Sequence, residues 1–216
     1  MIGRLPGSAW IATLPLLLPV AAGAQRDLRL AVTAAHADHR VDAGYGAEMS
    51  AGTLLGWDVR LRVRQGLILT TNGRAGRLTA HSPGAVDRDF AELGAGAEFM
   101  PLPWLALQSG FTTRSYSSIV ARQRWTFLRL GAEARVPFSG NEPRGVGRIT
   151  LLPSVSVNGL PRPDLAFEGA AGLAYTRRRA AVSVMYSLER CDFPTQGSGR
   201  RSEQLSTLSL GLGWKF

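Results

Sequence analysis

The segment that most constrains the fold is residues 206–216, where side-chain character alternates with a period of two. Large apolar residues fill most even positions, and small or polar residues fill the odd ones. Because successive side chains of a strand point to opposite faces, this alternation predicts a β-strand with one apolar face. The even positions are Ser206, Leu208, Leu210, Leu212, Trp214 and Phe216, and the odd positions are Thr207, Ser209, Gly211, Gly213 and Lys215.

The same rhythm recurs upstream, most clearly in residues 57–64. There Trp57, Val59, Leu61 and Val63 alternate with one aspartate and three arginines. Counting every such segment predicts ten strands, with eight as the closest alternative if two weak segments are loops. Pro153 weakens one candidate strand, because proline cannot donate a ladder hydrogen bond.

The connections between these segments alternate between short and long. Membrane-spanning strands need about 9–11 residues, so we expect the longer connections to be external loops and the shorter ones periplasmic turns. The short connections are 65–66, 101–103, 138–145 and 176–179, and the mostly longer ones are 37–52, 79–89, 117–122, 159–163 and 190–202.

The start of the chain predicts a secretory signal peptide over residues 1–24. Arg4 supplies a positive charge before an apolar stretch, and Ala22 and Ala24 form a small-x-small cleavage pattern. Two prolines and the short apolar length argue against a spanning helix. Residues 25–216 would then form one domain.

The terminal segment, with Phe216 last and Trp214 two positions earlier, resembles the C-terminal strand of bacterial outer-membrane β-barrels. With its signal peptide and strand rhythm, the chain resembles small outer-membrane barrel proteins of the porin-like and OmpX-like superfamily. The resemblance implies an all-β, antiparallel, up-and-down transmembrane barrel in the outer membrane. It also implies that the barrel-assembly machinery reads Trp214 and Phe216 during biogenesis.

Aromatic residues also gather beside the short connections, as an interfacial girdle would require. Nothing in a soluble sandwich demands that clustering, so it favours the membrane barrel. The girdle predicted here consists of Phe99, Trp104, Phe138 and Tyr175.

Charged residues alternate with apolar ones, and we expect them to face the lumen because charge is costly in lipid. The preferred interpretation is a plug of arginine–carboxylate pairs, and the alternative is a narrow anion-preferring pore. The predicted lumen network is Asp58, Arg60, Arg62, Arg64, Glu92, Glu98, Arg129, Glu133, Arg135, Arg148 and Glu168.

The formal net charge of +9 suggests acidic partners. For an exported chain these are outer-membrane lipids and lipopolysaccharide rather than nucleic acid. A single cysteine, Cys191, excludes an intramolecular disulfide. The sequence indicates no oligomeric state.

Three histidines, His36, His39 and His81, could serve a metal or a catalytic site. The chain matches outer-membrane lipid A deacylases only in the pair His81-Ser82, and omptin-like proteases have strands reaching farther outside the membrane than we expect here. We therefore predict no metal, no cofactor and no enzyme activity, and instead a structural, adhesive or surface-interaction role. The alternatives are a narrow channel for small solutes or anions and, third, a lipid-modifying enzyme.

Overall fold

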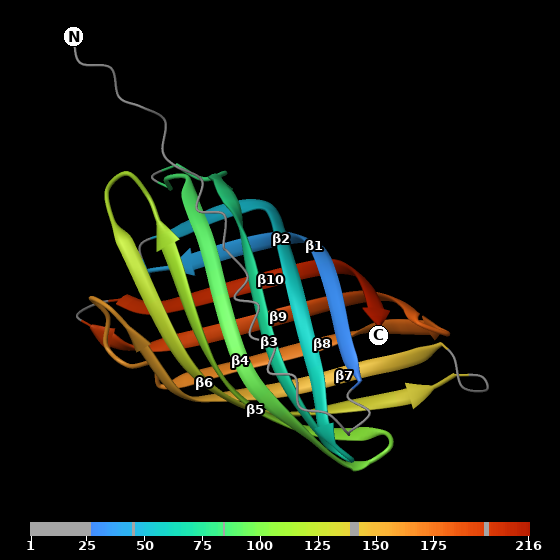
Figure 1. Ribbon diagram of the computed structural model, residues 1–216. Helices are drawn as coiled ribbons and strands as arrows, with labels where there is room; N and C mark the ends of the chain where they lie inside the picture. The colour runs from blue at the N-terminus through green and yellow to red at the C-terminus, as the bar shows by residue number, and fades with distance from the viewer. Residues whose placement is uncertain (1–26, 45, 84, 139–142, 197–198) are drawn as a thin grey trace, which may run out of the picture.

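The chain forms a closed antiparallel barrel of ten strands, as the alternation predicts (Figure 1). A computed structural model describes residues 27–44, 46–83, 85–138, 143–196 and 199–216, so the predicted signal peptide lies outside the described residues. The strands are β1 (Leu28–Asp42), β2 (Ala47–Arg64), β3 (Leu67–Ala80), β4 (Arg88–Leu102), β5 (Leu105–Ser117), β6 (Arg122–Pro137), β7 (Arg144–Val157), β8 (Leu165–Arg177), β9 (Ala180–Gln196) and β10 (Gly199–Lys215).

The barrel closes where the first strand pairs with the last, and Figure 1 shows β1 and β10 side by side. Leu30 lies opposite Trp214, and the amide of Phe216 donates to the carbonyl of Leu28 at 2.9 Å. The Nζ of Lys215 lies 3.1 Å from a carboxylate oxygen of Asp27. These contacts pair the terminal strand with the first strand along most of their length.

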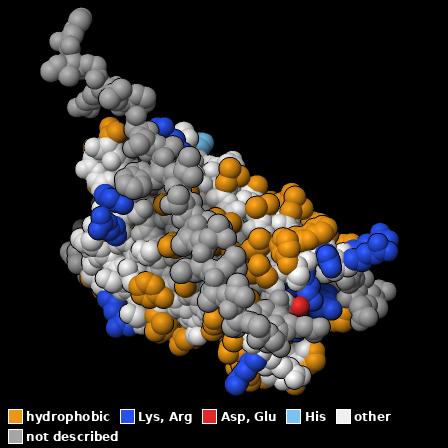
Figure 2. Space-filling view, in the orientation of Figure 1, with side chains coloured by type: hydrophobic (Ala, Val, Ile, Leu, Met, Phe, Trp, Pro, Cys, Tyr) orange, Lys and Arg blue, Asp and Glu red, His pale blue; other side chains and the backbone are white. Residues whose placement is uncertain are grey.

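The two faces of each strand differ in burial as well as in chemistry. On β10, outward Leu210 is 49% exposed whereas inward Leu205 is 3% exposed. Figure 2 shows hydrophobic side chains gathered across the visible wall, with Lys and Arg side chains toward its ends. A belt of exposed leucine, valine and aromatic side chains is stable only against lipid, because water disfavours so large an apolar surface.

The strands are longer than the sequence predicted, at 13–18 residues each. Most of the expected external loops 37–52 and 190–202 belong to β1, β2, β9 and β10, so those loop predictions were wrong. The reason is visible on β1, where inward Ala37, His39 and Val41 stay buried while outward His36 and Arg40 are polar. The sheet therefore continues beyond the apolar belt, where outward polar residues look like a loop in the sequence.

Pro153 lies in a bulge of β7, which also changes the inward face of the strand. Leu128 pairs with Ser154 and Leu130 with Leu151, so one extra residue of β7 is accommodated there. Leu152 and Val155 are both buried although they are three positions apart, whereas a regular strand turns every second side chain to the same face.

Past this bulge the wall is completed by a loop rather than by a neighbouring strand. The pairing of β7 with β8 ends at Leu151 and Phe167, whereas β6 stays paired with β7 as far as Val157. The guanidinium of Arg162, in the connection 158–164, donates to the carbonyl of Pro153. Leu160 of the same connection packs against the interior core.

No helix within the described ranges has the length and apolar character needed to cross a membrane.

Candidate functional site: the charged lumen

The lumen holds a continuous set of ion pairs, here called the lumen network. The strands from β2 to β9 contribute to it through their inward positions, so residues far apart in sequence converge on one interior. Its members are Asp58 and Arg60 from β2, Arg74 from β3, Glu92 and Glu98 from β4, Arg114 from β5, Arg129, Glu133 and Arg135 from β6, Arg148 from β7, Glu168 from β8 and Glu189 from β9.

The half of the network nearer the short turns begins at Arg60. Its guanidinium contacts Glu98 and lies 3.7 Å from Asp58. Arg135 then links two carboxylates, at 3.5 Å from Glu98 and 2.6 Å from Glu133. Alternating signs along this path let each charge stabilise its neighbours on both sides.

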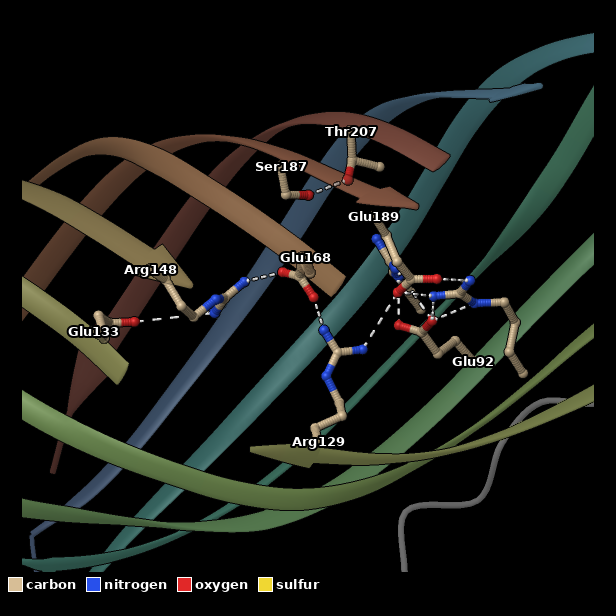
Figure 3. A network of polar contacts seen from close by, with 10 residues as sticks. Glu92, Arg129, Glu133, Arg148, Glu168, Ser187, Glu189 and Thr207 are labelled. Carbon is tan, nitrogen blue, oxygen red and sulfur yellow. Dashed lines mark hydrogen bonds and ion pairs between the residues drawn. The ribbon is translucent and has the colours of Figure 1, made fainter. Parts of the chain in front are cut away.

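Two arginines carry the network across to β8 and β9 (Figure 3). Arg148 lies 2.7 Å from one oxygen of Glu168 and 4.0 Å from Glu133. Arg129 contacts the other oxygen of Glu168 and lies 3.5 Å from Glu189. Glu168 therefore lies between two guanidinium groups, as Figure 3 shows.

Arg114 is the most enclosed cation of the described lumen. It donates to both oxygens of Glu189 at 2.6 and 2.9 Å, and to Glu92 at 2.6 Å. Arg74 donates to the same Glu92 at 2.8 and 3.2 Å. Bidentate guanidinium–carboxylate contacts of this kind are strong and directional.

Above Arg114, toward the long-loop end, the interior becomes an aromatic core. The guanidinium carbon of Arg114 lies 4.8 Å from the ring centre of Phe127 and 5.7 Å from that of Phe90. Trp125 stacks on Phe127 at 5.6 Å and meets Phe193 edge to face at 5.8 Å. Trp125 and Phe127 are both buried inside the barrel.

A second buried polar contact lies within this aromatic core. His39 stacks on Tyr116 at 4.5 Å between ring centres, and its Nε2 lies 3.5 Å from Glu203. A cavity of about 10 Å³ beside them is also lined by Trp125 and Cys191. That volume holds about one water molecule, so it offers no room for a substrate.

The structure gathers most of the predicted lumen residues and leaves two apart. Arg62 lies at the short-turn rim, 3.8 Å from Asp27. Arg64 is exposed at the end of β2. The predicted residues brought together are Asp58, Arg60, Glu92, Glu98, Arg129, Glu133, Arg135, Arg148 and Glu168.

Sequence reasoning missed Arg74, Arg114 and Glu189 as network members, although two of them left a readable signal. The alternation of the 104–116 segment puts Arg114 on the polar face. Glu189 continues the alternation of β9, on the same polar face as Ser183 and Ser187. Their pairing could not be read, because it joins strands on different sides of the barrel.

The predicted aromatic girdle and assembly residues lie on the outer wall toward the short-turn end. All are exposed, so they are not part of the interior packing, and they are Phe99, Trp104, Phe138, Tyr175, Trp214 and Phe216.

The other histidines do not combine into a site. His36 lies on the outer wall, 3.6 Å from Asp38, and the ring of His81 contacts the carbonyl of Thr79 at 2.7 Å. Among the residues that the structure describes, no group of three or more His, Cys, Asp or Glu could hold a metal ion. Cys191 is a buried free thiol.

The connection between β3 and β4, outside the apolar belt, is fixed by Asp87. One oxygen of Asp87 accepts the amide of Ala80 at 3.0 Å, and the other accepts the guanidinium of Arg77 at 2.9 Å. The amide, followed by the guanidinium, holds the pKa of Asp87 below its usual range.

Comparison with known proteins finds likeness in structure alone: no family model and no curated protein matches the sequence. The outer-membrane protease OmpT from Escherichia coli matches 88% of this chain and 96% of its own, with a TM-score of 0.61 and 11% identity. The translocator domain of the autotransporter NalP from Neisseria meningitidis matches 88% of each chain, with a TM-score of 0.48 and 16% identity. Neisserial surface protein A matches 87% of this chain and 97% of its own, with a TM-score of 0.39 and 14% identity.

At such identities the shared property is the fold, since activity lies in particular side chains. The closed sheet leaves no unpaired edge strand, and its apolar outer wall is stable against lipid. The chain thus has the fold of a transmembrane β-barrel of the outer-membrane type.

Proposed function

We propose that this protein is a closed, non-conducting and non-enzymatic barrel that acts as a structural or adhesive element of the outer surface. The observation that carries the proposal is the filled lumen. Ion pairs run from Arg60 to Arg114, and the aromatic core of Trp125, Phe127 and Phe193 occupies the interior above them. The two layers together would seal the barrel against ions and small solutes.

The charge balance of the network also disfavours the alternative of an anion pore. A conducting anion needs cations that can release their carboxylate partners. Arg114 holds two carboxylates, and Arg129 and Arg148 share Glu168. Separating such buried pairs costs several kcal/mol, which would oppose ion passage.

The outer rim supplies the surfaces that such a protein would use. Outward-facing arginines lie beyond the apolar belt, at the level of the lipid head groups, and we assign lipopolysaccharide phosphates as their partners. The barrel-assembly machinery would recognise Trp214 and Phe216 during biogenesis. The outer arginines are Arg40, Arg77, Arg122, Arg124 and Arg190.

Single-channel recording in planar bilayers tests the closed lumen. We expect no unit conductance from protein whose folding has been verified by heat-modifiable gel mobility. The variant Trp125→Ala with Phe127→Ala removes two large plug residues while every ion-paired side chain is kept, and it should admit current if it stays folded. Steady unit steps from the folded wild-type protein would contradict the proposal and support the narrow channel.

The proposed lack of enzyme activity is tested by a separate experiment. Mass spectrometry of lipid A from cells with and without the protein should show the same species. A new or missing acyl chain that depends on the protein would instead support the lipid-modifying alternative.

A further inference from the structure

The register of the closing strands puts three cations in one line across the barrel wall. Arg29 of β1 lies directly opposite Arg60 of β2 on one side and opposite Lys215 of β10 on the other. Arg29 shares its face with buried Ala35, and the line lies at the short-turn end of the lumen. We call these three residues the cation row.

The carboxylates near the cation row do not match its charge. The carboxylate of Asp27 forms ion pairs with both Lys215, at 3.1 Å, and Arg62, at 3.8 Å. Arg60 is shared between Asp58 and Glu98. Among the described residues Arg29 makes no ion pair, although it is the central member of the row.

Like charges directly opposite one another on neighbouring strands destabilise a sheet. An anion with more than one charge would remove that repulsion, because it can accept hydrogen bonds from adjacent cations at once.

We infer that the cation row binds a phosphate group, with Arg29 as its central ligand. Short turns of such barrels face the periplasm, so the site would open there. Because the row faces the lumen, a free phosphate or phosphomonoester reaches it more readily than a lipid head group. The inference is independent of whether the lumen conducts.

Thermal unfolding of the full protein in an uncharged detergent tests the site. Inorganic phosphate should raise the unfolding midpoint more than chloride does at the same ionic strength. Arg29→Gln should raise at least tenfold the phosphate concentration needed for the same increase in the unfolding midpoint. The matched control is Arg88→Gln at the opposite end of the barrel, whose guanidinium lies 2.6 Å from a carboxylate oxygen of Glu48; it should leave the phosphate effect unchanged.

A second readout separates binding from a purely structural role of Arg29. Without phosphate, Arg29→Gln should keep or raise the unfolding midpoint, because it removes repulsion; with phosphate it should lower the midpoint relative to wild type. The source of the phosphate is identified by repeating the measurement in phosphatidylcholine vesicles with and without phosphatidylglycerol. If inorganic phosphate no longer binds only when the anionic lipid is present, the site belongs to a lipid phosphate. Equal effects of phosphate and chloride, or equal phosphate effects in both variants, would overturn the inference.

Discussion

Arg114 is 3% exposed and lies between two carboxylates and two aromatic rings. Its contacts with Glu92 and Glu189 join β4, β5 and β9 into one interior. The importance of this residue follows from burial: a charge removed from water is stable only while its partners remain. The same pair at the rim would contribute little, because water would screen it.

Replacing Arg114 by alanine should therefore be among the costliest single changes in the barrel. Glu92 would keep Arg74, whereas Glu189 would keep only the 3.5 Å contact with Arg129. We expect the free energy of unfolding to fall by about 3–5 kcal/mol, measured by urea denaturation in lipid vesicles. The exposed pair of Arg40 and Asp42 gives the comparison, since Arg40→Ala should cost less than about 1 kcal/mol. Similar costs for both variants would show that Arg114 is not paired as described.

At the scale of the strands, alternation in the sequence predicted which side chains face inward, but not where each strand ends. Apart from Arg64 at the end of β2, the inward positions predicted for β2, β4 and β6 were correct, because a lipid-facing strand must be apolar on every second residue. The strand ends were not predicted because side chains beyond the membrane surface need not be apolar. Outward Asp38 and Arg40 of β1 are polar, yet β1 remains hydrogen-bonded to β2 and β10 there.

The connection between β3 and β4 should depend on pH through Asp87. Its pKa is lowered in the folded protein, so its contribution to local stability is fully present above the ordinary aspartate value of about 3.9 and is lost as the pH falls through the folded pKa. NMR titration should show the carboxyl of Asp87 and the amide of Ala80 changing together below that value. Asp87→Asn should abolish the transition, and a titration of Asp87 above the ordinary value would refute the assignment.

At the scale of the whole molecule, the fold was predictable and the connectivity of the site was not. The terminal segment and the repeated rhythm required a sheet with one lipid-facing side, and closure removes its edges. Which arginine meets which glutamate depends on how far the strands are staggered around the barrel. Neighbouring strands bring Arg148 close to Glu133, whereas Arg114 reaches Glu189 across the lumen.

The position of the membrane along the barrel can be tested on one strand. Leu210→Arg would place a charge within the apolar belt of β10, and should cost about 2–4 kcal/mol for folding into vesicles. Gln204→Arg puts the same side chain on the same face of β10, beyond the belt, and should cost much less. Unfolding titrations of both variants in vesicles give the two free-energy costs. Equal costs would show that the membrane does not lie at the assigned position along the barrel.

The contact between Arg114 and Glu189 spans 75 residues, and this has a consequence for how the protein reaches its membrane. No early hairpin contains both partners, so an isolated β4–β5 hairpin would carry Arg114 into lipid without Glu189. Stepwise insertion of hairpins would therefore be slow, because every intermediate would expose interior charge to hydrocarbon. A route in which the sheet curls and closes at the surface before it sinks through the bilayer avoids that barrier.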